Sequence, residues 1–167
     1  VFQIELNSLL EKRKIELDSK VEPNLPIVKT DAGKVQQIIF NFLANAVKFT
    51  STGGSVTLIA SRLKSNIKID HGNQTSYVRI SVCDTGPGIS PEDHERIFDK
   101  FTQLDTTVTK EHLGTGLGLT ISRDLAKLLH GRIELDSDQN RGATFSLVIP
   151  LTIEEQGTPL MPDVIES

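Results

Sequence analysis

The stretch DAGKVQQIIFNFLANAVKFT, residues 31–50, decides the fold, because its pattern predicts one long amphipathic helix. Asp31 stands at the N-cap position, where a carboxylate accepts hydrogen bonds from the first free amides of a helix. Apolar residues then recur at helical spacing; they are Val35, Ile38, Ile39, Phe42, Leu43 and Ala46. We therefore expect this helix to carry one apolar face into the core.

Strand patterns lie on both sides of this helix. The segments with apolar alternation or short apolar runs cover residues 15–21, 55–63, 76–84, 132–137 and 143–150. The first is expected to be an edge strand, because the two prolines of EPNLP end it. The polar stretch 64–75 is long for a hairpin loop and is expected to be a surface excursion.

Shorter helices are predicted elsewhere in the chain. Apolar residues at helical spacing in residues 1–14 indicate a short amphipathic helix, and HERIFDKF, residues 94–101, has a short helical pattern. A second strong helix is expected from Thr120 to His130, with Gly131 in the left-handed conformation that closes many helices.

Composition predicts one globular domain. The 167 residues are 37% hydrophobic and 24% charged, with a formal charge of -4 that argues against a nucleic-acid surface. Residues 1–152 are expected to form the domain and residues 153–167 a tail or linker. The single cysteine, Cys83, is expected to be buried and suits a reducing compartment. The chain carries no leader pattern, and we interpret Val1 as a cut within a longer protein.

Three polar residues of the long helix share one face. Asn41, Asn45 and Lys48 are spaced i, i+4 and i+7, opposite the apolar stripe. Carboxamide oxygens can bind a hard cation, and an ammonium group can meet phosphate charge. The same spacing would also result from an ordinary solvated helix face.

Two glycine-rich segments follow strands or precede a helix. DTGPGI, residues 84–89, would let the backbone approach a flat ligand next to a carboxylate, although a tight turn has the same composition. GTGLGL, residues 114–119, would aim free amides at phosphates, although it could be a capping turn. Its spacing matches neither the Walker loop nor the dinucleotide fingerprint.

The order of these segments resembles the catalytic domain of sensor histidine kinases over roughly residues 1–150. NFLANAVKFT is similar to the N box of that family, and DTGPGI and GTGLGL are similar to its two main glycine boxes. IFDKF and GATF resemble its phenylalanine box and last small glycine motif. The resemblance implies an α+β fold, the Bergerat two-layer α/β sandwich, with a mixed, mostly antiparallel sheet covered by helices on one face.

The resemblance also implies a role for individual residues in binding ATP and Mg²⁺. Asn45 would hold magnesium, Lys48 would meet the phosphates, and Asp84 would bond the adenine amine with help from Thr144. A lid between Asp99 and Leu113 would close over the triphosphate. The other residues expected at the nucleotide are Phe49, Gly86, Gly88, Ile89, Phe98, Phe101, Gly114, Thr115, Gly116, Leu117, Gly118 and Leu119.

Asn41 is expected to decide between transfer and hydrolysis. Related gyrase, chaperone and mismatch-repair ATPases have a glutamate there that activates water, and an amide cannot act as that base. The resemblance therefore implies a cytoplasmic catalytic domain that is monomeric in isolation and phosphorylates a histidine on a separate dimerisation segment. A response regulator or an attached receiver domain would then accept the phosphoryl group. Two alternatives stay open, which are a hydrolytic ATPase of the same superfamily and a pseudokinase or interaction module.

Overall fold

The computed structural model describes residues 2–63, 76–99 and 117–151. The helices in these ranges are α1 (Phe2–Arg13), α2 (Ala32–Phe49) and α3 (Gly118–Leu128), and the short 3₁₀ turns are η1 (Pro91–Asp93) and η2 (Arg96–Phe98). The strands are β1 (Glu16–Val21), β2 (Ser55–Leu63), β3 (Tyr77–Asp84), β4 (Arg132–Ser137) and β5 (Ala143–Pro150). The predicted excursion 64–75 and the predicted tail 153–167 lie outside the described residues.

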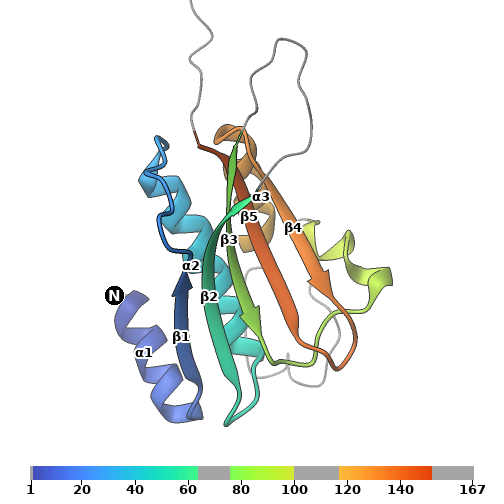
Figure 1. Ribbon diagram of the computed structural model, residues 1–167. Helices are drawn as coiled ribbons and strands as arrows, with labels where there is room; N and C mark the ends of the chain where they lie inside the picture. The colour runs from blue at the N-terminus through green and yellow to red at the C-terminus, as the bar shows by residue number, and fades with distance from the viewer. Residues whose placement is uncertain (1, 64–75, 100–116, 152–167) are drawn as a thin grey trace, which may run out of the picture.

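The strands form one sheet in the order β1-β2-β3-β5-β4. β1 runs parallel to β2, and every other pair is antiparallel. Figure 1 shows α2 and α3 on one side of this sheet, with α1 beside β1. The predicted fold class, a two-layer α+β sandwich with a mixed, mostly antiparallel sheet, is confirmed.

The long helix α2 provides the centre of the core. Asp31 caps its first turn by accepting the Lys34 N–H at 3.0 Å, as the sequence predicted. Ile38, Phe42 and Val47 are fully buried, and the Phe42 ring packs at 5.4 Å from the ring of Phe145 on β5. The apolar stripe read from the sequence therefore faces the sheet.

A small substitution in this stripe tests the core. Ile38→Val should lower the free energy of unfolding by about 0.5–1.5 kcal/mol, because it removes one buried methylene group and leaves a void. The same substitution at Ile27, which is 94% exposed, should change stability by less than about 0.5 kcal/mol. Denaturant unfolding of both variants measures the difference, and equal effects would show that the core is misplaced.

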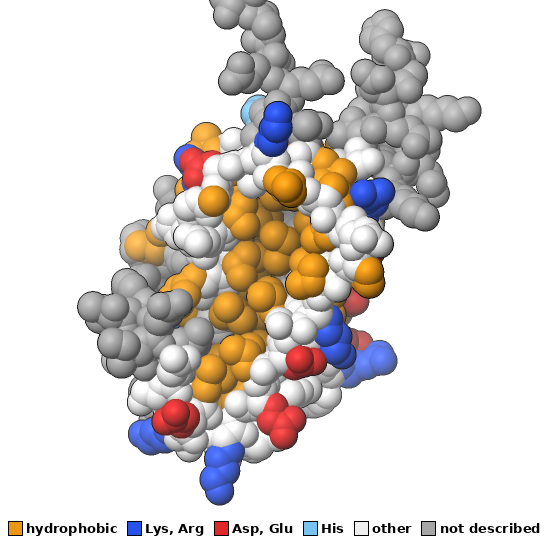
Figure 2. Space-filling model, turned by 60° about the vertical axis from the view of Figure 1, so that its left-hand side comes forward, with side chains coloured by type: hydrophobic (Ala, Val, Ile, Leu, Met, Phe, Trp, Pro, Cys, Tyr) orange, Lys and Arg blue, Asp and Glu red, His pale blue; other side chains and the backbone are white. Residues whose placement is uncertain are grey.

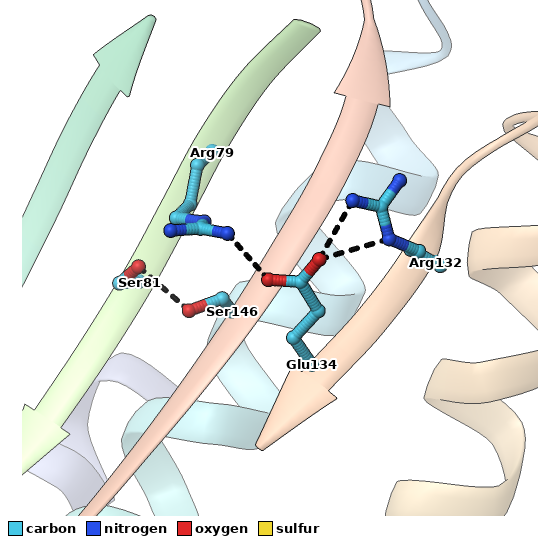
Figure 3. Close-up of polar contacts among 5 residues, drawn as sticks. All are labelled: Arg79, Ser81, Arg132, Glu134 and Ser146. Carbon is cyan, nitrogen blue, oxygen red and sulfur yellow. Dashed lines mark hydrogen bonds and ion pairs between the residues drawn. The ribbon is translucent and has the colours of Figure 1, made fainter. Parts of the chain in front are cut away.

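The opposite face of the sheet carries polar side chains, and we call it the open face. Figure 3 shows its centre, where Glu134 on β4 binds both Arg79 on β3 and Arg132. Beside them, the buried hydroxyls of Ser81 and Ser146 share a hydrogen bond of 2.8 Å. These contacts pair the Glu134 carboxylate and the two serine hydroxyls with polar partners, which suits a face without a covering helix.

Cys83 differs from its prediction. We expected a buried residue within an apolar run, but Cys83 is half-buried. Cys83 is paired with Thr144 on β5, and alternation along β3 turns its side chain to the open face, whereas Val82 points into the core. An apolar run in a strand covers both faces of a sheet, and only one of these faces is packed here.

β1 forms one edge of the sheet, and each of its residues is exposed. The amides of Glu16 and Glu22, at the ends of this segment, donate toward the β2 side, to Gly54 and Ala60. By alternation, the Ser19 N–H points outward, and it donates to the Asp18 carboxylate at 2.8 Å. The predicted edge strand is therefore confirmed.

An apolar hollow lies where β1 meets α2. Figure 2 shows apolar side chains gathered on this side of the molecule and surrounded by polar and charged ones. A cavity of about 200 Å³ lies here and is lined by Leu17, Asp18, Ser19, Leu43 and Leu58. The core is therefore less well covered at this edge than under β3 and β5.

The end of α3 corrects a second prediction. His130, not Gly131, adopts the left-handed conformation, with φ of 53°. The His130 N–H bonds the Lys127 carbonyl and the Gly131 N–H bonds the Ala126 carbonyl, which is a Schellman ending with histidine in the glycine position. Gly131 is needed for space, because an added Cβ would lie 2.4 Å from the Val148 carbonyl oxygen. α3 also begins two residues earlier than predicted, at Gly118.

Candidate functional site

The polar face of α2 carries the first group of predicted site residues. Asn41, Asn45 and Lys48 are all half-buried, while Phe42 and Val47 on the other face are fully buried. The Asn45 carboxamide has no hydrogen-bond partner within the part of the chain that the structure describes. α2 therefore presents a row of partly accessible polar groups beside the core.

Asp84 ends β3 with one oxygen engaged. Its Oδ1 accepts the N–H groups of Gly86 at 2.8 Å and Ala143 at 3.3 Å. Its Oδ2 accepts from no residue in the described ranges. Burial raises the pKa of Asp84, and the two backbone hydrogen bonds partly oppose this rise. The carboxylate is thus fixed in direction, with one acceptor oxygen left for a ligand.

Two glycines permit the chain to fold tightly around Asp84. An added Cβ would lie 2.0 Å from the Asp84 carbonyl oxygen at Gly142, and 1.9 Å from the Asp138 carbonyl oxygen at Gly88. Both have positive φ, of 76° and 72°, which other residues adopt at a cost. Hence the turns at DTGPGI and GATF, which lie far apart in sequence, pack closely against each other.

Ser137 connects the same two turns. Its hydroxyl accepts the Ile89 N–H at 2.8 Å and donates to the Gly142 carbonyl at 2.8 Å. The bond fixes the start of the segment after the first glycine turn, next to the partly buried Ile89. Ser137 is not among the predicted site residues, because a single serine at the end of a strand has no distinguishing pattern.

The glycine turns reach α2 at two points. An added Cβ at Gly86 would lie 3.2 Å from the Phe49 carbonyl oxygen, at the end of α2. An added Cβ at Gly118, at the start of α3, would lie 2.4 Å from Asn41 Oδ1. Asn41 and Phe49 are eight positions apart, about 12 Å along the helix. Asn45 lies between the two points of contact.

Among the described residues, no side chain caps the N-terminus of α3. Leu117 occupies the N-cap position, no side chain there accepts a first-turn amide, and the first turn has no acidic residue. By contrast, Asp31 caps α2. Free first-turn amides carry partial positive charge and suit an anion. The start of α3 therefore offers donors beside the polar face of α2.

Lys48 adds a cation near the end of α2. Its ammonium lies 5.0 Å from the centre of the Phe49 ring, and burial lowers the pKa of Lys48. The guanidinium of Arg13 donates to the Lys48 carbonyl at 2.6 Å and ties α1 to this end of α2. The backbone of Lys48 is thus tied to α1, and its ammonium group lies over the Phe49 ring.

Two other predicted site residues, Thr144 and Phe98, contact different parts of the structure. Thr144 pairs with Cys83 and points to the open face, so the structure does not bring its hydroxyl to Asp84, and Ala143 contributes its N–H instead. Phe98 is buried in the core, and the Arg123 guanidinium lies over its ring. Phe101, Gly114, Thr115 and Gly116 lie outside the described residues, as does the predicted lid up to residue 113.

Comparison with known proteins agrees with this geometry. Residues 30–153 match the family described as histidine kinase-, DNA gyrase B- and HSP90-like ATPase. A curated relative, the autoinducer 2 sensor kinase/phosphatase LuxQ of Vibrio vulnificus strain YJ016, is 40% identical over 138 residues, which cover 80% of this chain and 15% of LuxQ. This chain therefore spans less than one fifth of that relative.

Solved structures of histidine kinases have the same fold. The catalytic domain of histidine kinase ThkA is 25% identical, with a TM-score of 0.69 over 91% of this chain and 90% of that domain. Full-length ShkA in complex with AMPPNP is 34% identical, with a TM-score of 0.68 over 91% of this chain and 30% of ShkA. The chain belongs to the histidine kinase-, DNA gyrase B- and HSP90-like ATPase family and is a catalytic domain of the histidine kinase type.

Within the described ranges, every helix is too short or too polar to cross a bilayer.

Proposed function

We propose that this domain binds ATP with magnesium and transfers the terminal phosphoryl group to a histidine on a separate helical dimerisation segment. The observation that carries the proposal is the convergence on α2, where Gly86 meets Phe49 and Gly118 meets Asn41. A ligand lying along α2 between these contacts would have Asp84 near one end and the first amides of α3 near the other. The complex of the related ShkA with AMPPNP supports an adenine nucleotide as that ligand.

Asp84 would recognise the base. Its Oδ1 is held by two backbone amides, so its second oxygen is directed and can accept the exocyclic amine of adenine. The Phe49 carbonyl lies next to Gly86 in this turn, and Ile89 at its end packs partly against the core. A purine with a carbonyl at the same position would place two acceptors against each other.

Asn45 and Lys48 would serve the phosphate end. A carboxamide oxygen is a suitable ligand for a hard cation, and the Asn45 group is half-buried with no partner among the described residues. When bound, magnesium neutralises phosphate charge as transfer proceeds. Lys48 would supply a positive charge on the same helix face, and the first amides of α3 would supply donors.

Asn41 favours transfer over hydrolysis. A carboxamide cannot remove a proton from water, so this helix offers no base at the position where related ATPases have glutamate. The acceptor would then come from outside the described residues. His94 is held against the Ile89 carbonyl at 3.3 Å, and His130 sits in the turn that ends α3. A response regulator or an attached receiver domain would take the phosphoryl group next.

A comparison of two nucleotides tests the proposal. ATP with magnesium should raise the melting temperature of the domain more than GTP with magnesium at the same concentration, because guanine has a carbonyl where adenine has the amine that would donate to Asp84. Thermal shift or calorimetry measures the effect. Equal stabilisation by the two nucleotides would contradict the role of Asp84, and no stabilisation by either would contradict nucleotide binding altogether.

A further inference from the structure

The side chain of Asn41 is bound to α3 at two positions. Its Nδ2 donates to the Ser122 hydroxyl at 2.8 Å. Its Oδ1 lies so close to Gly118 that an added Cβ there would be 2.4 Å away. Gly118 and Ser122 are four residues apart, so both lie on the face of α3 that meets α2. The carboxamide therefore spans the first turn of α3.

The hydrogen bond with Asn41 accounts for a serine at position 122. It is 2% exposed, in the interior of a helix where alanine is the better helix former. A buried hydroxyl without a partner costs free energy, and this one has Asn41 as its partner. The hydrogen bond joins two elements that are 81 residues apart in sequence.

The other side of α3 is anchored separately. The buried hydroxyl of Thr120 donates to the Phe98 carbonyl at 2.8 Å, and Arg123 lies over the Phe98 ring at 5.4 Å. These contacts fix α3 against η2 but not against α2. Apolar packing of Ala126 and Leu129 in the shared core also holds α3 beside α2, and the Asn41–Ser122 bond adds a polar link close to the first α3 amides.

We propose that Ser122 is a positioning residue for the triphosphate. Through its hydrogen bond with Asn41, Ser122 holds the start of α3 where the free amides of α3 can bind the same phosphates as Asn45 and Lys48 on α2. The proposal rests on the proposed function, because it assumes that ATP lies along α2. It assigns Ser122 no contact with nucleotide. It also assigns the Asn41 carboxamide to holding α3 rather than to chemistry.

A contrast between two ligands separates positioning from simple packing. ATP with magnesium uses both ends of the site, whereas adenosine has the base and no phosphate. Ser122→Ala should weaken ATP binding about three- to tenfold, the range for one hydrogen bond, and leave adenosine affinity unchanged. Calorimetry measures ATP affinity, and a chemical-shift titration measures the weaker adenosine affinity. A general loss of packing would change the two affinities together.

Two further variants sharpen the test. Ser146→Ala removes an equally buried hydroxyl whose partner, Ser81, lies on the open face, and it should change neither affinity. In an Asn41→Ala background, Ser122→Ala should add no further loss of ATP affinity, because the shared bond is already gone. Ser122→Cys, which keeps a group at the γ position but hydrogen-bonds only weakly, replaces Ser122→Ala if the alanine variant does not fold.

The outcomes separate this inference from the function on which it rests. If wild-type protein fails to bind ATP, the proposed function fails and the inference fails with it. If wild-type protein binds ATP and Ser122→Ala binds it equally well, or loses adenosine affinity to the same degree, the inference alone is overturned. Full additivity with Asn41→Ala would also overturn it.

Discussion

Asp84→Asn should weaken ATP binding by about 1.5–3 kcal/mol, or roughly 10- to 150-fold, the range for a hydrogen bond to a charged group. The substitution keeps the shape of the side chain, and the amide oxygen can still accept from Gly86 and Ala143. What is lost is the second charged acceptor. Calorimetric titration with ATP and magnesium measures the change, and an unaltered dissociation constant would remove Asp84 from the site.

The same carboxylate should make binding depend on pH. Burial raises the pKa of Asp84, so the group takes up a proton at a higher pH than an ordinary aspartate does. ATP affinity should be full above this raised pKa and fall as pH decreases through it, and Asp84→Asn should lack that fall. In the absence of nucleotide, a carboxyl group with a raised pKa stabilises the folded state only at low pH, and this contribution is lost as the pH rises through the raised pKa. Without nucleotide, the Asp84→Asn variant should therefore be at least as stable as wild type at neutral pH.

A matched control is available on the open face. Asp136→Asn makes the same chemical change on β4 at an exposed position that pairs with Thr144. It should leave both ATP affinity and its pH dependence as in wild type. A similar loss in this control would mean that net charge, and not the directed oxygen of Asp84, controls binding.

Asn45→Ala should abolish phosphoryl transfer to an added dimerisation segment of the parent protein. The alanine removes the only group on this helix face that we assign to magnesium, and transfer depends on charge neutralisation at the phosphates. Labelled ATP with magnesium and the purified segment provide the assay. The exposed Asn7→Ala variant in α1 should transfer label as wild type does. Undiminished transfer by Asn45→Ala would reject the assignment.

The chain alone should bind labelled ATP and acquire no stable phosphohistidine. Transfer needs an acceptor nitrogen in line with the terminal phosphate at roughly 3–3.5 Å, and His94 is held by its contact with Ile89. In the paired reaction, label should appear only on the added segment. His112 belongs to the predicted lid. Acid-labile label on the chain alone that disappears in His112→Ala would instead place the acceptor within this chain.

Local patterns predicted most of the secondary structure. The periodic stripe of α2 and its Asp31 cap were read correctly, and the strand predicted over residues 143–150 has the bounds of β5. The errors arose where one residue type can serve two purposes. Gly131 provides space rather than a left-handed turn, and the apolar run containing Cys83 covers two faces with different environments.

The site was less predictable than the fold, because its geometry depends on contacts between distant segments. The family resemblance named Asp84 and Asn45, yet the face to which Thr144 points follows from the register between β3 and β5. Likewise, Ser122 becomes noticeable only once α3 is placed beside Asn41. No spacing within either helix announces that hydrogen bond.

The outer edge of β1 has a consequence for self-association. An exposed edge strand offers unpaired backbone groups to another sheet, and such pairing produces dimers or aggregates. Here the Asp18 carboxylate occupies the outward Ser19 N–H, and the Asp18 and Lys20 side chains leave charge along the same edge. A second copy adding edge to edge would have to displace this bond and desolvate these charges. The isolated domain is therefore expected to stay monomeric even with one side of its sheet uncovered.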